Sequence, residues 1–359
     1  MSILAFLVLT SSALLSVIFN RHKSVNIDIV FFITLFFIVG FRFHVGADYE
    51  SYIGWFNNVV DFGSAGGEIG FDIISFIAIA LKMNYQGMFL IFSLITSFFF
   101  YLGYRYFAKD SVYLKLTFFL IFIIFVYPLM TNGIRQVTAA SIIFYASKYC
   151  IEKKLIKFLM LVFLASLFHT SAVLLFPLYF ILNLDFNRTL MIATLISSFV
   201  IASFHGFTKF MIFVVNELQF LDVGGYVSTY LNNRSFQDFS FGVVAWIQVL
   251  MLLIIIFFKN CFGNKKALFS LNGFFFYTLF LIFAYDSRIF TRLSVLFSVF
   301  PAMTIAFSIE LFDKDSRFLA GILITFAYIF LLLFLIYFGY SNPDFSSIFP
   351  YRFNFNIFD

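Results

Sequence analysis

Leu116–Met130 (LTFFLIFIIFVYPLM), Thr131–Gln136 (TNGIRQ) and Val137–Tyr149 (VTAASIIFYASKY) follow one another in the sequence and indicate the fold class of the protein. Two almost uncharged segments flank a short polar stretch that contains an arginine. Apolar segments of about 18 residues are typical of transmembrane helices, and segments near that length recur along this chain. We therefore expect Arg135 to lie in the first turn of a membrane helix, with Thr131 or Asn132 as its cap.

Arg135 is electrostatically unusual at this position. A cation near a helix N-terminus opposes the helix dipole, so an arginine there is unfavourable without a counter-charge. The first backbone N–H groups of a helix have no carbonyl partner, and together with a guanidinium they suit an anion such as phosphate. We interpret Arg135 as half of a phosphate clamp. The alternative is that its side chain extends to lipid headgroups.

The composition excludes a soluble protein. The chain of 359 residues is 62% hydrophobic and only 11% charged, and its mean hydropathy is +1.01. This predicts an all-α polytopic membrane protein with about 10–12 transmembrane helices and additional re-entrant or interfacial helices. We expect residues 1–359 to form a single integral membrane domain. The net charge of +5 fits basic cytoplasmic loops and does not indicate nucleic-acid binding.

Basic residues also predict the orientation in the membrane. Arg21–Lys23 and Lys148–Lys157 are expected on the cytoplasmic side, so segments 42–72 and 205–240 would be extracytoplasmic and contain interfacial helices. Only an odd number of crossings can then separate Arg42 from Arg105, yet two apolar pieces lie between them. We favour a re-entrant or interfacial segment at 69–82, which is short for a core about 30 Å thick. The alternative is that the first two spans are inverted.

Segment Phe158–Leu182 has His169 at its middle and allows two interpretations. It could be one long helix with a buried histidine that bonds a carbonyl. It could instead be two tilted half-spans that meet at His169 on the outer side. The second version returns Asp185 and Arg188 to the cytoplasm, as the positive-inside rule favours.

A second arginine site lies late in the chain. Arg288 and Arg292 are four residues apart, on one helix face, where like charges repel unless an anion lies between them. Ionisable groups in membrane segments are costly and usually mark a functional site. Structural pairs are the alternative: Arg288 with Asp286, and Arg42 with Asp48. We expect Arg135, His169 and Arg288 to gather at one face of the membrane.

Four short motifs resemble the EpsG family, the Wzy-like polymerases of bacterial surface polysaccharides such as O-antigen, capsule and exopolysaccharide. They occur in order along the chain, with a weaker match at Pro350-Tyr351. The motifs are Arg42–Tyr49 (RFHVGADY) with Tyr52, Gly133–Gln136 (GIRQ) before a basic loop, Ala165–Ala172 (ASLFHTSA) and Asp286–Arg288 (DSR).

The resemblance implies an architecture like that of the C-type, lipid-dependent glycosyltransferases. It also implies a multi-pass protein of the bacterial inner membrane that acts on undecaprenyl-diphosphate-linked oligosaccharides at the outer, periplasmic face. The expected reaction is metal-independent and inverting. It transfers a glycan from the lipid diphosphate to the non-reducing end of a lipid-linked acceptor, and a chain-length regulator is a further expected partner. A flippase or a glycan ligase of the same pathway, or a scaffold protein, are the alternatives.

The expected site divides into three groups of residues. His169, or else Asp48, would be the catalytic base, with His169 preferred because its ordinary pKa is near neutral. The diphosphate would be bound by arginines, and the sugars by tyrosines that could alternatively be interface anchors. The arginines are Arg135, Arg288, Arg292 and Arg42, and the tyrosines are Tyr49, Tyr52, Tyr226 and Tyr230. No cofactor is expected, and no metal-ligand spacing is recognisable.

Overall fold

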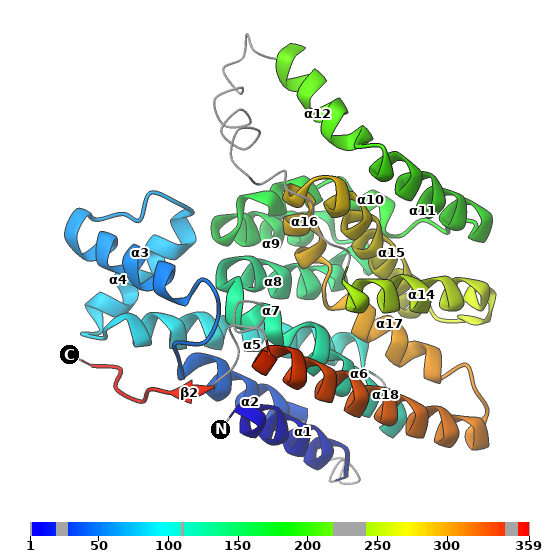
Figure 1. The fold of residues 1–359 in the computed structure, drawn as a ribbon, viewed down its shortest axis with the longest axis horizontal. Helices are drawn as coiled ribbons and strands as arrows, with labels where there is room; N and C mark the ends of the chain where they lie inside the picture. Colours follow the sequence, from blue (N-terminus) through cyan, green and yellow to red (C-terminus); the bar gives the residue numbers. More distant parts are fainter. Residues whose placement is uncertain (1, 19–27, 109–110, 218–241, 342–350, 359) are drawn as a thin grey trace. The chain divides into compact units, whose positions relative to one another are not determined.

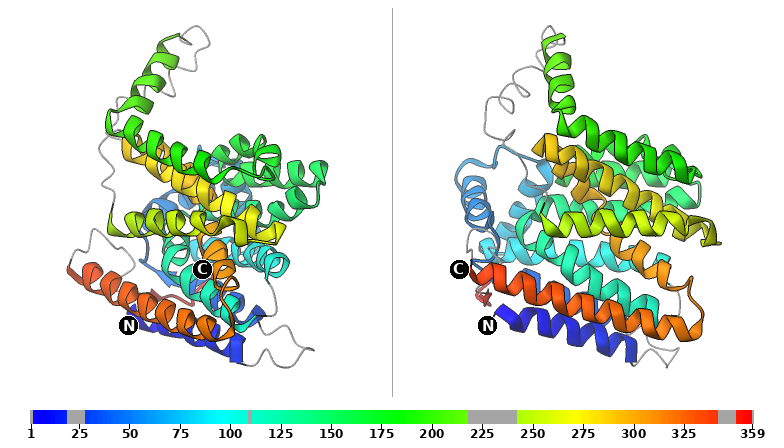
Figure 2. Two further views of the ribbon diagram at one scale, coloured as in Figure 1. Left: turned by 90° about the vertical axis from the view of Figure 1, so that its right-hand side faces the viewer. Right: turned by 45° about the vertical axis from the view of Figure 1, so that its right-hand side comes forward.

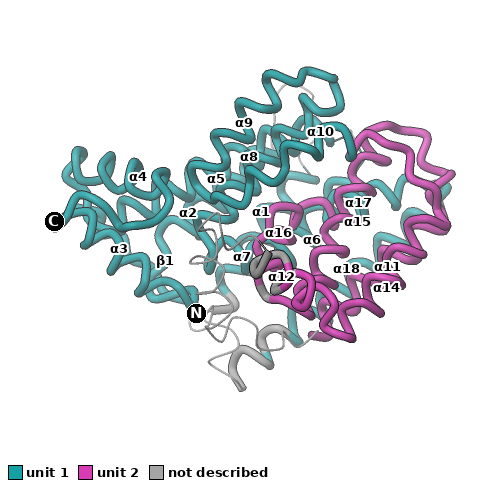
Figure 3. Tube along the Cα trace, turned by 90° about the horizontal axis from the view of Figure 1, so that it is seen from above, with its two compact units in different colours: residues 1–181, 302–359 teal, residues 182–301 magenta. Residues whose placement is uncertain are grey.

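The computed structural model describes residues 2–18, 28–108, 111–217, 242–341 and 351–358 (Figure 1). Contacts divide the chain into two compact units (Figure 3). Unit 1 comprises residues 1–181 and 302–359, and unit 2 comprises residues 182–301.

Unit 1 consists of helices joined by short connections. In order they are α1 (Ser2–Ile18), α2 (Asp28–Gly40), α3 (Tyr49–Phe62), α4 (Ile69–Ala80), α5 (Tyr85–Phe107), α6 (Val112–Phe125), α7 (Tyr127–Asn132), α8 (Ile134–Ile151), α9 (Leu155–Phe168), the 3-10 helix η2 (Thr170–Leu175), α10 (Leu178–Ile181), most of α17 (Phe300–Ile309) and α18 (Lys314–Ser341). α1 and α18 lie side by side in both views of Figure 2. Their contact includes the Thr10 and Tyr328 hydroxyls, which are 2.5 Å apart.

Unit 2 contains the helices between them. They are α11 (Arg188–Ser203), α12 (Gly206–Glu217), α14 (Val243–Phe257), η5 (Lys259–Cys261), α15 (Lys265–Asp286), η6 (Arg288–Phe290) and α16 (Thr291–Leu296). The predicted span 289–309 is therefore broken into η6, α16 and α17. Pro301 follows the last break, and it has no N–H with which to continue a preceding helix.

The hydropathy of the helices confirms the all-α polytopic membrane class. Among the described residues, three helices are long and apolar enough to cross a membrane: Tyr85–Phe107, Lys265–Asp286 and Asp315–Phe334. Shorter apolar helices of 10–17 residues accompany them. Many large apolar side chains on these helices are exposed, for example Phe326 and Phe330, as expected of lipid-facing surfaces.

α5 and α8 form the centre of unit 1 and run from one end of it to the other. They pack side by side, with the Thr96 and Thr138 hydroxyls 2.7 Å apart and the Phe107 and Phe144 rings stacked at 5.2 Å. Both helices carry a basic residue in the last turn, Arg105 in α5 and Lys148 in α8. The end where these two helices finish is hereafter the basic end, and the end where they begin is the opposite end.

The opposite end is closed by a short two-stranded sheet (Figure 1). β1 (Arg42–Phe43) pairs antiparallel with β2 (Arg352–Phe353), with Arg42 opposite Phe353. α5 begins at this same end, because the Gln86 amide donates to the Gly40 carbonyl at 2.7 Å. The chain from β1 through α3 and α4 to the start of α5 therefore makes no net crossing. This agrees with the re-entrant or interfacial interpretation of segment 69–82.

Candidate functional site

The loop after β1 packs against the corner between α7 and α8, so two of the sequence motifs meet there. Gly46 has a φ of +107°, and a Cβ on it would lie 2.0 Å from the Thr131 carbonyl oxygen, so only glycine fits. The next residue, Ala47, donates its backbone N–H to Asn132 Oδ1 at 2.7 Å. The expectation that Thr131 or Asn132 caps α8 is therefore wrong. The N-cap is Gly133, without a side-chain hydrogen bond.

Arg135 lies in the first turn of α8, as predicted, and has a counter-charge that the sequence analysis missed. Its Nη1 donates to Glu68 Oε2. The guanidinium carbon lies 4.3 Å from the centre of the Trp55 ring, a cation–π contact from α3. The positive charge of Arg135 also acts on Tyr52, where it partly offsets the rise that burial causes in the pKa of the hydroxyl. The Arg135 side chain is nevertheless 20% exposed.

His169 lies where the segment 158–182 breaks. α9 ends at Phe168, His169 has extended backbone angles, and η2 begins at Thr170. Of the two interpretations of this segment, the structure supports two pieces that meet at His169. The imidazole is 6% exposed, and its Nδ1 is 3.0 Å from Glu68 Oε1. Glu68 therefore joins His169 and Arg135, which are 34 residues apart in the chain, through its two carboxylate oxygens.

The connection between α3 and α4 holds Glu68 in place. Asp72 accepts hydrogen bonds from the Ser64 hydroxyl at 2.7 Å and the Ala65 N–H at 2.9 Å, which fixes the loop that precedes Glu68. Glu68 is the N-cap residue of α4. Two residues later, Gly70 lies so close to α9 that an added Cβ would be 2.7 Å from the Leu167 carbonyl oxygen. This close approach brings the start of α4 to the end of α9, beside His169.

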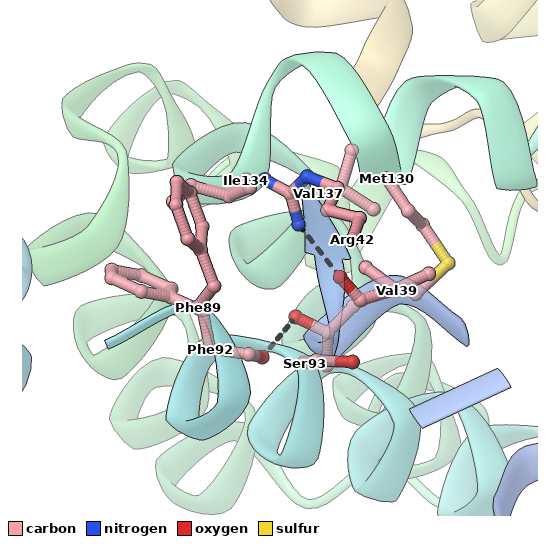
Figure 4. Close-up of a pocket in the computed structure, with 9 residues that line it drawn as sticks. Val39, Arg42, Phe89, Phe92, Ser93, Met130, Ile134 and Val137 are labelled. Carbon is pink, nitrogen blue, oxygen red and sulfur yellow. Dashed lines mark hydrogen bonds between the residues drawn. The ribbon is translucent and has the colours of Figure 1, made fainter. Parts of the chain in front are cut away.

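Arg42 lies apart from this cluster and is completely buried. Nε donates to the Val45 carbonyl at 3.1 Å and Nη1 to the Val39 carbonyl at 2.9 Å, and the guanidinium carbon is 4.4 Å from the Phe89 ring centre. Its third nitrogen, Nη2, has no hydrogen-bond partner among the residues that the structure describes. The side chain lines a small cavity with room for about one water molecule (Figure 4). Burial lowers the pKa of Arg42 from its ordinary value.

The other residues predicted on this segment have contrasting environments. Tyr49 and Tyr52 are 1% and 3% exposed. Tyr49 stacks on Phe89, Tyr52 stacks on Phe71, and burial raises the pKa of the Tyr52 hydroxyl. Asp48 is exposed at the N-cap of α3, and its charge acts on Tyr52 together with that of Arg135. The other two predicted sugar-binding residues, Tyr226 and Tyr230, lie outside the described residues.

Arg288 and Arg292 belong to unit 2, in η6 and α16. The preceding Asp286 is buried and binds the start of α12. It accepts hydrogen bonds from the Phe207 N–H at 2.7 Å and the Thr208 N–H at 3.1 Å, at the start of α12. The Nδ1 atom of His205 lies 3.3 Å from the same carboxylate. The gathering of Arg288 and Arg292 with Arg135 stays a prediction.

Sequence reasoning missed Glu68 and Trp55. Glu68 lies in an acidic, polar segment, in which one more carboxylate is not unusual. The signal that could have identified it is its position, directly after Gly66-Gly67 and directly before an apolar helix. Trp55 lies three residues after Tyr52, on a neighbouring position of the same helix face. In the described ranges, no three His, Cys, Asp or Glu residues are grouped so that they could hold a metal ion.

Comparison with known proteins identifies the family. A family model described as "EpsG family" matches residues 25–353, which include the whole Arg135–Glu68–His169 cluster and Arg288. No curated protein and no solved structure gives a significant match. The family consists of Wzy-like polysaccharide polymerases and points to a multi-pass membrane protein of polysaccharide synthesis. A match over nearly the whole chain assigns this protein to the EpsG family.

Proposed function

We propose that this protein polymerises oligosaccharide repeat units carried on a polyprenyl diphosphate, of which undecaprenyl diphosphate is the bacterial form. One observation carries the proposal: in a chain of the EpsG family, a partly exposed arginine and a buried histidine from distant segments meet at one end of unit 1. An arginine can bind the leaving diphosphate, and a histidine can accept a proton near neutral pH.

In the proposed reaction, Arg135 binds the diphosphate of the donor, and the same role for Arg288 and Arg292 stays a prediction from the sequence. A hydroxyl of the acceptor repeat attacks the anomeric carbon from the face opposite the diphosphate. The new glycosidic bond forms as the bond to the phosphate oxygen breaks, and the diphosphate leaves with the bonding electrons. The guanidinium groups stabilise the charge that develops on this leaving group, so no metal is required.

His169 accepts the proton of the attacking hydroxyl in this proposal. Its Nδ1 faces Glu68, so Nε2 is the ring nitrogen that takes the proton. Asp48 is the second candidate base. It is exposed on the same segment as Trp55 and could instead orient the acceptor sugar. General-base catalysis of this kind contributes about 10²–10⁴-fold to a rate.

Arg42, Tyr49 and Tyr52 support the site without binding the substrate in this proposal. All three side chains are buried, and the Tyr52 ring packs against Trp55. We therefore do not assign diphosphate binding to Arg42. At the cluster itself, Trp55 is only partly buried and is the aromatic side chain that we propose for contact with a sugar.

The orientation of the protein follows from its charges. Arg105, Lys148 and the following lysines lie at the basic end of unit 1, and the Arg135–Glu68–His169 cluster lies at the opposite end. Because Lys and Arg gather on the cytoplasmic side, we propose that the cluster faces the periplasm or exterior of the inner membrane. That is the face at which a lipid-linked repeat would be joined to an acceptor, with a chain-length regulator as a further partner.

The test compares surface-glycan ladders from cells that produce Arg135→Ala, His169→Ala or wild-type protein. Loss of polymerase leaves single repeats on the final acceptor. His44→Ala is the matched control, because His44 is an exposed histidine that pairs with Glu50 at the same end of the unit. We expect full ladders for the control and single repeats for the other two variants. Absence of any exported repeat would indicate a flippase, and long chains retained on the lipid would indicate a ligase; either result overturns the proposal.

A further inference from the structure

We propose that Glu68 is a positioning residue that holds Arg135 before the substrate arrives and releases it to the lipid diphosphate, while it keeps His169 oriented throughout. This inference rests on the proposed function, because it concerns the same site. Glu68 then has two opposing effects on the enzyme. It weakens binding of the diphosphate, because it competes for Arg135, and it speeds turnover, because it orients His169.

The two carboxylate oxygens have separate partners. Oε2 accepts from Arg135 Nη1, and Oε1 lies 3.0 Å from His169 Nδ1. The contact to His169 can therefore persist when Arg135 changes partner. Glu68 is 14% exposed, so its charge is only partly screened by solvent, and both interactions are stronger than those of a surface pair.

Arg135 can change partner without losing its place. Its guanidinium has five N–H donors, of which Nη1 is engaged by Glu68, and its face rests on the Trp55 ring at 4.3 Å. A diphosphate carries more negative charge than one carboxylate and can accept two parallel hydrogen bonds from a guanidinium. Arg135 is the more exposed partner of the pair, at 20% against 14% for Glu68.

His169 needs the carboxylate for a different reason. A carboxylate that accepts from Nδ1–H leaves the lone pair of the neutral imidazole on Nε2, which the proposed reaction uses. The same carboxylate stabilises the imidazolium that forms when the proton is taken up, as in other carboxylate–histidine pairs. The backbone holds Glu68 in position for this, since Asp72 fixes the preceding loop and Gly70 abuts α9.

Glu68→Gln separates the two effects. The amide oxygen would face Arg135, which can only donate, and the amide NH₂ would then face His169 Nδ1. That arrangement favours the tautomer with its proton on Nε2, which cannot accept another. The negative charge that competes with the diphosphate for Arg135 is lost at the same time. A purely structural role for Glu68 would instead weaken binding and turnover together.

The experiment uses the full-length protein in lipid nanodiscs and sugar-free undecaprenyl diphosphate as the probe. We expect Glu68→Gln to bind the probe about tenfold more tightly than wild type, the change expected when about 1.4 kcal/mol of competing interaction is removed. In assays with lipid-linked repeats, KM should fall and kcat should fall by about 10²–10⁴-fold. Glu50→Gln is the matched control, because Glu50 makes the same contact to a histidine Nδ1 at an exposed site. It should leave both quantities within about twofold of wild type.

Equal or weaker binding of the probe by a Glu68→Gln protein that elutes and melts as wild type overturns the inference. Should that variant not fold, Glu68→Ala serves instead. It removes the carboxylate from both partners, so tighter binding with slower turnover is again expected, and unchanged affinity overturns the inference. Probe binding requires no polymerisation. If Glu68→Gln binds the probe more tightly but the wild-type protein itself makes no polymer, the proposed function is refuted and the exchange at Glu68 still stands.

Discussion

Arg42 and Arg135 are both arginines beside apolar helices, yet their surroundings differ. Arg42 follows α2 directly, and its guanidinium donates to the Val39 carbonyl in the last turn of that helix and to the Val45 carbonyl. The last carbonyls of a helix have no partner within it, so Arg42 satisfies a group that would otherwise be buried and unpaired. Arg135 instead pairs with a carboxylate and remains partly exposed.

Replacing Arg42 by alanine is expected to destabilise the protein. The change leaves two buried carbonyls without their donors and costs about 2–5 kcal/mol in free energy of unfolding. The measurement is the midpoint of thermal unfolding of the purified protein in detergent. Arg352→Ala is the control, because Arg352 is exposed on the paired strand and its loss should change the midpoint little. If the Arg42→Ala protein is stable but no longer binds undecaprenyl diphosphate, Arg42 binds the diphosphate and the structural role is wrong.

At this scale the sequence indicates some residues of the cluster and not others. Arg135 and His169 stand out because each is an ionisable group between apolar segments. Glu68 does not, because its role depends on two residues that are far away in the chain and reach it only in the folded protein. The burial of Tyr49 and Tyr52 likewise depends on Phe89 and Phe71, which belong to other helices.

Among the elements, α4 is the one that places the cluster. Its short apolar sequence and the amphipathic spacing of α3 predict helices that do not simply cross the membrane, and both helices are present. The contact between α4 and α9 was not predictable from periodicity. It depends on Gly70, a residue without a side chain, at the point where the two backbones meet.

Gly70→Ala is expected to move the start of α4 away from α9 and so separate Glu68 from His169. The new Cβ would lie 2.7 Å from a backbone oxygen that cannot move freely, and overpacking of this kind costs about 1–3 kcal/mol. We expect a lower midpoint of thermal unfolding and a large loss of polymerisation. Gly54→Ala is the control, because nothing lies within 4 Å of a Cβ at Gly54 in α3. That variant should be neutral or more stable by up to about 1 kcal/mol, and equal behaviour of the two variants would contradict the role of Gly70.

For the molecule as a whole, the charge distribution gives a testable orientation. The sequence left open whether the segment between β1 and α5 crosses the membrane. In the structure β1 and the start of α5 lie at the same end of unit 1, so this segment makes no net crossing. The sequence alone could not settle this, because a short apolar helix such as α4 has the same composition whether it crosses or returns. The positions of the lysines and arginines indicate which end of unit 1 faces the cytoplasm.

Cysteine labelling of intact cells measures that orientation. Asn58→Cys in α3 and Lys154→Cys at the basic end are exposed positions, and the exposed Cys261 is first replaced by serine. A membrane-impermeant maleimide should label Asn58→Cys in intact cells and Lys154→Cys only after permeabilisation. The reverse pattern would place the Arg135–Glu68–His169 cluster in the cytoplasm and contradict the proposed site of reaction.

The pairing of β1 with β2 also has a consequence for biogenesis. Tyr351 donates its hydroxyl to the Ile38 carbonyl, a contact between residues 313 apart, and the Asn354 N–H donates to the Phe41 carbonyl at 2.9 Å. The ribosome synthesises residue 38 long before residue 351, so a nascent chain that is already inserted in the bilayer still lacks these two contacts. The pairing of β1 with β2 is therefore a late, long-range step, and a polypeptide terminated before β2 would leave the corner around β1 open.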